Sequence, residues 1–358
     1  MDMDIAVEPA EARVNVGEAE SLKLVCRSIR QESRNAKTYV FGTEGDVRVL
    51  FRAGQFLNIT FGVNGQEAVR SYSISSSASH GARLAITVKR IPNGTVSNWL
   101  FDNLRVGDRV RAEGPLGAFT DEEIEGPLVF LSAGSGVTPV AAMMRTYVDL
   151  CDDRDVVFLH FSRSPEDTIF AADFSAWARA LPRARIIVVA TNPSFGSGWV
   201  GPTGRISQGL VSALIPDIAG RTVFACGPEG FMQTAREIAE RMGVPADRFF
   251  QESFVTFVTK VAEDAHEGPS EKAYEVRFAK SGSTTTCSET KSILKAAQAI
   301  NVKIQTSCGK GICGTCRVKL TSGTVTMTHG GGIKQREIDQ GYILACCSKP
   351  TSDLVVDR

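Results

Sequence analysis

The sequence contains no run of about 20 apolar residues, the length that a membrane-spanning helix needs. It carries no excess of either charge, because 40 Lys and Arg offset 40 Asp and Glu, and this balance argues against a nucleic-acid or membrane-surface role. Residues 1–20 lack the apolar core of a signal peptide, and no internal repeat or low-complexity tract is present. We therefore expect a cytoplasmic protein of two or three domains.

The nine cysteines are too few to build a disulfide scaffold in a chain of 358 residues. Four of them form a single ligand-like pattern, whereas Cys26, Cys151, Cys226 and Cys287 stand alone. This usage fits a reducing compartment and directs attention to one metal site.

Three regions differ in texture. Short alternating strands with Gly and Asn turns, between residues 21 and 119, predict an antiparallel β-barrel. Between residues 126 and 254, strands buried on both faces alternate with amphipathic helices and predict an open, parallel α/β sheet. A final region with strands, one helix and a cysteine loop begins near residue 273. The expected domains are residues 18–122, 123–258 and 273–358, with an exposed linker over 259–272.

The cysteine loop carries the strongest motif. Cys308, Cys313 and Cys316 follow the C-x4-C-x2-C spacing of plant-type [2Fe–2S] ligation, and Cys346 follows thirty residues later. Gly309, Gly311 and Gly314 allow the backbone positive φ angles, so that it can fold closely around the sulfides. A zinc site is the alternative, but zinc favours paired C-x2-C units or histidine, and only one such unit is present. We expect Cys346 to be the fourth ligand and the adjacent Cys347 to turn the opposite way.

The charge is divided unevenly along the chain. Residues 273–358 hold 12 Lys and Arg against 6 Asp and Glu, a net of +6. The remaining residues hold 28 (40 − 12) against 34 (40 − 6), a net of −6. A basic C-terminal domain can dock on the acidic remainder or on an acidic patch of a partner; a solvated face with no role is the alternative.

A motif at the end of a predicted strand has the chemistry that a flavin needs. Arg70 can pair with a phosphate through two hydrogen bonds, Tyr72 can stack on a flat ring, and Ser73 can reach a flavin N5 or O4 atom. An ordinary strand with alternating faces is the alternative. Arg70-Ser71-Tyr72-Ser73 resembles the R-x-Y-S motif of the ferredoxin reductase family, and Gly54-Gln55-Phe56 upstream is also similar to that family.

A glycine turn downstream enters a predicted helix, whose first N–H groups can hold a pyrophosphate. A pyrophosphate favours FAD over FMN, which carries a single phosphate. The residues expected to bind the flavin are Arg70, Tyr72, Ser73, Val88, Lys89, Gly94, Val96 and Ser97.

Two further loops follow buried strands and have the context of a dinucleotide site. In the first, Pro139 stands where the third glycine of the Rossmann fingerprint would be, which is similar to the ferredoxin reductase family, where Thr138 would lie near the nicotinamide. In the second, the resemblance places Cys226 against the nicotinamide C4 atom, although a small buried hydrophobe is the alternative reading. The expected residues are Gly134, Ser135, Gly136, Thr138, Pro139, Cys226, Gly227 and Pro228.

Two other positions complete the expected site. Glu252-Ser253-Phe254 resembles the terminal E-x-F of the same family, which lies close to the flavin ring; Phe254 as plain core is the alternative. Arg163 follows a buried strand, where an arginine can accept a 2′-phosphate. Related NADH-using reductases carry an arginine there too, so NADH is favoured and NADPH stays open. The expected catalytic residues are Ser73, Thr138, Cys226, Glu252 and Phe254.

The order of barrel, nucleotide domain and β-grasp ferredoxin domain resembles reductases that serve Rieske-type oxygenases, such as the glycine betaine monooxygenase reductases. It also resembles the hybrid-cluster-protein reductases. The resemblance implies NADH-dependent reduction of FAD, transfer of single electrons through [2Fe–2S], and a protein acceptor, with an oxygenase component favoured. A redox sensor, or a regulatory subunit of a larger complex, is the competing class.

Overall fold

The computed structural model describes residues 13–14, 21–45, 47–194, 197–254, 272–306, 309, 311, 314–329, 332–333 and 335–358. The expected linker over 259–272 lies outside these ranges except for Lys272. Within them, no helix is long and apolar enough to cross a membrane.

The N-terminal unit is a six-stranded antiparallel barrel with the strand order β6-β5-β8-β2-β3-β7. A bridge between Ile74, directly after β6, and Ile86 on β7 closes the circle. Tyr39, Phe41 and Leu57 are among the fully buried side chains that fill its interior. The elements are β2 (Ser21–Ser33), β3 (Ala36–Thr43), β5 (Phe56–Val63), β6 (Gln66–Ser73), β7 (Leu84–Lys89), α1 (Thr95–Asn103) and β8 (Arg109–Leu116), with a small β1 (Arg13–Val14) and β4 (Arg48–Val49) pair.

The central unit is a five-stranded parallel sheet in the order β11-β10-β9-β12-β13. Alternate strand residues fill two cores: Phe130 and Phe158 pack with α2 and α3, whereas Leu131 and Leu159 pack with α4 and α5. The elements are β9 (Leu128–Ala133), α2 (Val137–Leu150), β10 (Val156–Ser162), α3 (Ala171–Ala180), β11 (Ala184–Ala190), α4 (Gln208–Leu214), β12 (Thr222–Gly227), α5 (Glu229–Arg241) and β13 (Phe249–Ser253).

The C-terminal unit is a mixed five-stranded sheet in the order β15-β14-β20-β16-β18, and α6 supplies Ile293 and Leu294 to its core. A second small sheet pairs β17 with β19. The elements are β14 (Ala273–Phe278), β15 (Ser283–Ser288), α6 (Ile293–Ala299), β16 (Arg317–Ser322), β17 (Val325–Met327), α7 (Gln335–Asp339), β18 (Tyr342–Leu344), β19 (Ser348–Pro350) and β20 (Leu354–Val356).

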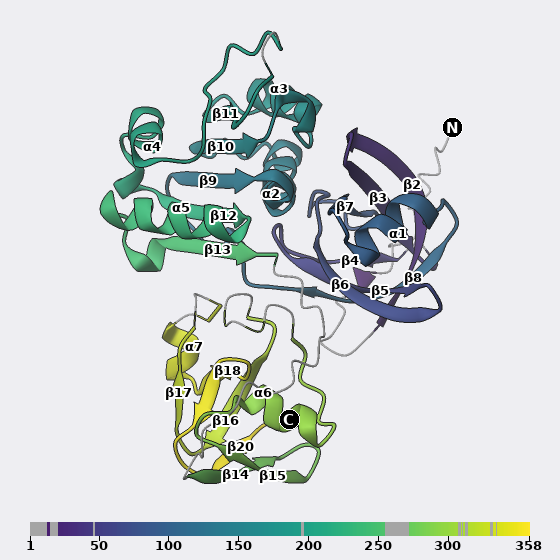
Figure 1. Cartoon of the computed structure of the whole chain (residues 1–358), viewed down its shortest axis with the longest axis vertical. Helices are drawn as coiled ribbons and strands as arrows, with labels where there is room; N and C mark the ends of the chain where they lie inside the picture. The colour runs from purple at the N-terminus through teal and green to yellow at the C-terminus, as the bar shows by residue number, and fades with distance from the viewer. Residues whose placement is uncertain are drawn as a thin grey trace, which may run out of the picture.

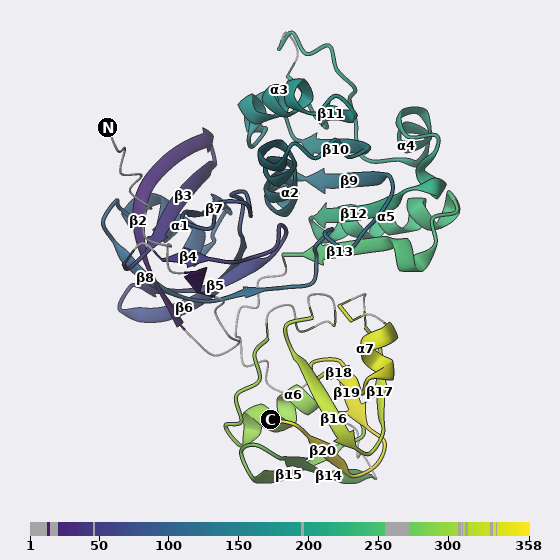
Figure 2. The same cartoon turned by 180° about the vertical axis from the view of Figure 1, so that it is seen from behind.

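The three units meet in one assembly, with the barrel beside the parallel sheet and the C-terminal unit below both (Figures 1 and 2). In both views β14 and β15 lie at the end of the C-terminal unit that is farthest from the other two. The barrel, the parallel α/β sheet and the C-terminal α+β unit confirm the predicted fold class.

Candidate functional site

The residues of the R-x-Y-S motif lie on β6. Tyr72 is half-buried, and its ring packs edge-on against Phe61 with 6.2 Å between ring centroids. The Arg70 guanidinium donates to the Val69 carbonyl oxygen at 2.8 Å on the barrel surface. Because alternate strand residues face opposite sides, Arg70 and Tyr72 share one face and Ser73 points to the other. A cation and an aromatic ring are therefore presented together on one side of the barrel.

The helix α1 begins at the predicted glycine turn. Gly94 is its N-cap residue, and no described side chain caps it. A Cβ atom at Gly94 would lie 2.6 Å from Ser97 Oγ, so a larger residue at this turn would displace the Ser97 hydroxyl. The Ser97 hydroxyl is already engaged, since it accepts the Ile91 N–H at 3.2 Å. The backbone N–H groups that open α1 are the groups that fit a phosphate at this position.

A cavity of about 220 Å³ opens between this turn and the loop that follows β10. It is rich in cations, and one of them, Lys89, reaches toward the first glycine loop: an ideal Cβ on Gly134 would lie 3.4 Å from Lys89 Nζ. Burial lowers the pKa of Lys89, Asp167 opposes that shift, and Arg163 adds to it. The lining residues are Asn35, Lys89, Arg90, Ile91, Pro92, Asn98, Arg163 and Asp167.

Asp167 was not identified by the sequence reasoning. It lies in the short 3-10 turn Pro165–Asp167, five residues after Ser162, the last residue of β10. The available signal was an acidic side chain downstream of a strand's carboxyl end, where ribose hydroxyls are commonly bound. The structure brings this carboxylate into the same cavity as Arg163, which sequence reasoning had considered alone.

The two predicted nucleotide loops lie against each other. Gly136 has an ordinary φ, but a Cβ there would meet the Cys226 carbonyl oxygen at 2.1 Å and the Gly227 nitrogen at 2.7 Å. The Thr138 hydroxyl donates to the Ser135 carbonyl oxygen at 3.0 Å and so fixes the turn into α2. Pro139 lies buried in the first turn of α2. The two loops therefore meet at the carboxyl ends of β9 and β12.

Cys226 is fully buried and contributes to the core beneath α2. Burial raises the pKa of its thiol well above the ordinary value, and the Glu252 carboxylate acts in the same direction. The thiol is therefore held neutral and is not a poised nucleophile. Pro228, in contrast, is exposed at the start of α5.

Glu252 connects the parallel sheet to the barrel. It pairs with Cys226 across β12 and β13, and the Ser73 hydroxyl donates to its Oε2 atom at 3.1 Å. Both side chains are buried. Phe254, just beyond β13, is 38% exposed, so it is not a core residue in this structure. Three expected catalytic residues, Ser73, Cys226 and Glu252, thus lie together, and Thr138 lies in the loop packed against Cys226.

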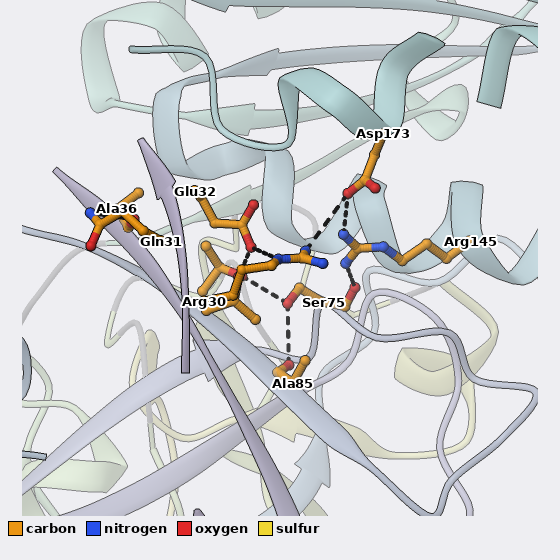
Figure 3. Close-up of polar contacts among 10 residues, drawn as sticks. Arg30, Gln31, Glu32, Ala36, Ser75, Ala85, Arg145 and Asp173 are labelled. Carbon is orange, nitrogen blue, oxygen red and sulfur yellow. Dashed lines mark hydrogen bonds and ion pairs between the residues drawn. The ribbon is translucent and has the colours of Figure 1, made fainter. Parts of the chain in front are cut away.

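A second contact between barrel and sheet is made by Arg145 on α2 (Figure 3). Its guanidinium donates to the Ser75 carbonyl oxygen and, at 2.5 Å, to Asp173 Oδ2 on α3. The same guanidinium lies 4.4 Å from the centre of the Phe170 ring. Arg30 of β2 approaches Asp173 from the barrel side at 4.0 Å. This network is polar, aromatic and partly buried, and sequence pattern alone gave no sign of it.

Of the predicted cluster ligands, Cys316 and Cys346 are described, whereas Cys308 and Cys313 lie outside the described residues. The Gly311 N–H donates to Cys346 Sγ at 3.2 Å, and the Cys346 N–H donates to Cys316 Sγ at 3.4 Å. Backbone N–H groups directed at ligand sulfurs are a feature of iron–sulfur sites and tune their potential. The donor set present fits a [2Fe–2S] cluster.

The loop glycines behave as predicted. Gly309, Gly311 and Gly314 have φ values of +59°, +70° and +75°, and a Cβ at Gly314 would meet the Gly332 carbonyl oxygen at 2.6 Å. The prediction for Cys347 is wrong. It is half-buried, and its Sγ lies 2.6 Å from the position of a Cβ on Gly311, so it faces the loop as Cys346 does. Residues 345–347 form a turn closed by the Cys347 N–H and the Leu344 oxygen, so strand alternation does not apply there.

Three family descriptions match the chain, one for each of the three structural units. The oxidoreductase FAD-binding domain matches residues 23–120, the oxidoreductase NAD-binding domain matches residues 130–237, and the 2Fe-2S iron–sulfur cluster binding domain matches residues 276–351.

Curated relatives match over nearly the whole length. The glycine betaine monooxygenase reductase subunit of Pseudomonas aeruginosa is 34% identical over 343 residues, covering 93% of this chain and 94% of the relative. The stachydrine N-demethylase reductase subunit of Rhizobium meliloti is 38% identical over 344 residues, covering 95% and 97%. NADH oxidoreductase HCR of Escherichia coli is 32% identical over 307 residues, covering 86% and 88%.

The barrel, the paired glycine loops and the cysteine loop define a flavin-, NAD- and iron–sulfur-containing reductase, and the chain belongs to the ferredoxin reductase family in the branch that carries a C-terminal [2Fe–2S] domain. Within that family it is an NADH-dependent oxidoreductase whose cofactors are FAD and a [2Fe–2S] cluster.

Proposed function

We propose that this chain is the reductase component of a two-component Rieske-type oxygenase system and delivers electrons to the oxygenase component. The relatives named as reductase subunits of a monooxygenase and an N-demethylase support this choice, because they match at 34% and 38% identity over more than nine-tenths of the chain. Both names describe oxidative attack on a quaternary-amine substrate, so we propose a substrate of that chemical class for the oxygenase.

The domain limits that we propose are residues 18–122, 123–258 and 273–358, with a linker over 259–272. The family matches support these limits because each falls inside one of them. The order places the nucleotide domain between the flavin barrel and the cluster domain in sequence, whereas in space the C-terminal domain contacts the barrel directly.

For the flavin we propose that Arg70 pairs with phosphate, Tyr72 stacks on the ring, and Ser73 bonds the N5 or O4 edge. Support comes from the shared face of Arg70 and Tyr72 and from the buried Ser73–Glu252 bond. The uncapped start of α1 supports a pyrophosphate seat. The residues proposed for it and for the adjoining edge are Val88, Lys89, Gly94, Val96 and Ser97.

For NADH we propose that Gly134, Ser135, Gly136, Thr138 and Pro139 form the loop that faces the nicotinamide half, together with Cys226, Gly227, Pro228 and Phe254. The cavity beyond them, with Lys89 and Arg163, supports an adjoining phosphate and ribose seat. For the cluster we propose the thiolates of Cys308, Cys313, Cys316 and Cys346; the N–H bonds to Cys316 and Cys346 support the two described ligands.

When bound, the cofactors take a hydride from NADH as a two-electron unit and release the electrons singly through the cluster. The protein's own residues position the flavin and the dinucleotide and exclude water from the space between them. Ser73 and Glu252 fix the barrel against the sheet, the glycine loops admit the dinucleotide at close range, and the neutral Cys226 keeps the floor of the site apolar. Hydride transfer from NADH does not need a thiolate, so the neutral Cys226 thiol is compatible with this role.

The observation that carries the proposal is the full-length match to oxygenase reductase subunits. The test is reconstitution: the purified protein, NADH and a Rieske oxygenase component with a quaternary-amine substrate, assayed for demethylated product. We expect product formation that requires the reductase, NADH and the oxygenase component together. Rapid NADH oxidation with ferricyanide, but no transfer to any such oxygenase, would overturn the oxygenase assignment and leave the reductase activity intact.

One alternative has an observation of its own. The match to NADH oxidoreductase HCR covers 86% of the chain at 32% identity and favours a hybrid-cluster protein as acceptor. Presenting both acceptors in the same assay separates the two, since the true acceptor will be reduced at submicromolar concentration and the other only at much higher concentration.

A further inference from the structure

Two ion pairs join the C-terminal domain to the barrel and to the segment that leads from the barrel into the parallel sheet. Lys303 Nζ lies 3.1 Å from Glu113 Oε1 on β8, and Arg336 Nη2 on α7 lies 2.9 Å from Glu123 Oε2. In both pairs the cation belongs to the C-terminal domain and the carboxylate to the rest of the chain. This polarity matches the net charges of +6 and −6 on the two parts. The charge asymmetry therefore corresponds to a physical contact.

The two cations flank the cysteine loop. Lys303 precedes Cys308 by five residues, and Arg336 lies at the start of α7, just after the segment in which the Gly332 N–H donates to the Gly311 oxygen at 3.0 Å. Between the two pairs the loop itself contacts the barrel, because an ideal Cβ on Gly314 would lie 3.8 Å from Ala118 Cβ. The pairs thus hold the edge of the loop, and not a remote face of the domain, against the barrel.

The contacted segment of the barrel leads directly to the flavin motif. Next to Ala118, a Cβ on Gly117 would lie 3.0 Å from the Phe56 ring. Phe56 is the strand partner of Ser73 in the register of β5 and β6. A short, packed route therefore runs from the cysteine loop through Gly117 and Phe56 to the motif strand. Short routes favour electron transfer, so the position of the loop matters to the reaction.

The pairs are suited to opening as well as closing. Their side chains are exposed, at 79% and 40% for Lys303 and Glu113 and at 64% and 50% for Arg336 and Glu123. Exposed ion pairs are individually weak and are screened by salt, with a Debye length of about 10 Å at 0.1 M. Ala118 covers the edge of the cysteine loop in this arrangement. An acceptor can therefore reach that edge only after the contact between the loop and the barrel has broken.

We propose that Lys303–Glu113 and Arg336–Glu123 form an electrostatic latch that docks the cysteine loop on the barrel for reduction and releases it for the acceptor. The latch deepens the proposed electron-transfer function and rests on it, but it does not depend on which protein is the acceptor. Lys303, Glu113, Arg336 and Glu123 act in it as positioning residues.

The direct test is zero-length cross-linking of the full-length holoprotein with a carbodiimide, which joins a lysine amine to a carboxylate only when the two are in contact. Peptide mass spectrometry then quantifies the Lys303–Glu113 product. The internal control is Lys280–Asp357, an exposed pair of the same kind at 3.2 Å that lies wholly within the C-terminal domain. We expect the Lys303–Glu113 yield to fall at least about threefold between low salt and 0.5 M salt relative to the control pair.

Variants extend the test to each pair. Arg336→Glu should lower the Lys303–Glu113 yield by about threefold or more, although it touches neither residue, because the two pairs close one contact. Lys280→Glu should leave that yield unchanged. The two charges are exchanged in the Lys303–Glu113 pair and not in the Arg336–Glu123 pair, because Glu123 also lies 3.8 Å from Arg52 Nη1. Lys303→Glu alone should open the contact, and Lys303→Glu with Glu113→Lys should restore it.

Stopped-flow absorbance provides the functional readout. After mixing with NADH, bleaching of the flavin should keep its rate in Lys303→Glu, whereas bleaching of the cluster should slow by about tenfold and recover in the charge-exchanged variant. A Lys303–Glu113 yield that is absent at low salt, or is unaffected by salt and by Arg336→Glu, would overturn the latch. Neither result bears on the oxygenase assignment, which rests on reconstitution with an acceptor.

Discussion

The Ser73 hydroxyl and the Glu252 carboxylate meet at 3.1 Å across the boundary between the barrel and the parallel sheet. Ser73 is 4% exposed and Glu252 is 5% exposed, so the bond is shielded from water. It joins the last residue of the flavin-motif strand to the strand that lies beside Cys226. The hydride donor and acceptor sites belong to these two units, and this bond helps to fix their separation.

We expect Glu252→Ala to slow the reduction of the flavin by NADH by about 10- to 100-fold, because small displacements of reacting groups cost rate steeply. Glu252→Gln should retain most of the rate, since the amide keeps the size and can still accept from Ser73. Stopped-flow bleaching of the flavin, with flavin content measured for each variant, checks this. Equal rates for Glu252→Ala and the unaltered protein would show that the bond has no positioning role.

The approach of the two nucleotide loops gives a steric prediction at Gly136. An added methyl group would lie 2.1 Å from the Cys226 carbonyl oxygen, so the loops must separate in Gly136→Ala. We expect the KM for NADH to rise at least about tenfold and the free energy of unfolding to fall by about 1–3 kcal/mol. Steady-state kinetics with NADH as the varied substrate and thermal unfolding measure the two effects. Gly230→Ala on α5 is the matched control, because nothing lies within 4 Å of that added methyl group.

Much of the fold follows from sequence periodicity. The barrel was predicted between residues 21 and 119 and the parallel sheet between residues 126 and 254, and the strands β2 to β8 and β9 to β13 lie within these two ranges. The elements that periodicity missed are short or polar. The strand β15 (Ser283–Ser288) consists largely of Thr and Ser, and α7 spans five residues, so neither shows an apolar pattern.

The candidate site also contains residues that local sequence motifs predict and residues that they do not. Glycine turns and cysteine spacing could be recognised locally, since each motif occupies a few consecutive residues. Asp167 and Arg145 could not, because their roles arise only when distant elements meet: Asp167 enters a cavity with Lys89, and Arg145 reaches Ser75 seventy positions away. The opposite error at Cys347 came from assuming a strand where the chain turns.

Arg145 is expected to set the angle between the barrel and the sheet (Figure 3). It bonds the Ser75 oxygen and Asp173 at once, and it stacks over Phe170. Arg145→Met should lower the melting temperature by several degrees and reduce kcat for flavin reduction more than it raises KM. Arg145→Lys should recover little, because an ammonium cannot make the forked contact of a guanidinium. Scanning calorimetry and single-turnover kinetics measure both effects.

The choice between NADH and NADPH can be tested with Asp167→Asn. The carboxylate shares its cavity with Arg163, where it opposes a 2′-phosphate and can bond ribose hydroxyls. We expect the ratio of kcat/KM for NADPH over NADH to rise by about tenfold, because one negative charge is removed beside the cations. Steady-state ferricyanide reduction with each coenzyme gives the ratio. Asp173→Asn, outside the cavity, should not change it.

His160 makes a prediction about acid stability. It is fully buried on β10; its Nδ1 lies 2.7 Å from Ser132 Oγ, and its Nε2 has no partner among the described residues. Burial lowers the pKa of His160 from 6.5 to about 3, and the nearby Lys89 cation adds to the shift. The imidazole of His160 therefore binds a proton below pH 6.5 in the unfolded chain, but only below about pH 3 in the folded chain.

It follows that His160 stabilises the folded state fully above pH 6.5 and that this contribution is lost as the pH falls toward 3. Between pH 7 and pH 4 we expect the loss to be about 2–3 kcal/mol, at 1.36 kcal/mol per pH unit with allowance for relaxation of the buried site. The combined change His160→Phe and Ser132→Ala removes both the titrating ring and its polar partner. Urea unfolding at several pH values should then give a shallower decline than in the unaltered protein. Parallel declines in the two proteins would mean that the ring gains a proton without unfolding, through a local opening beside Phe174.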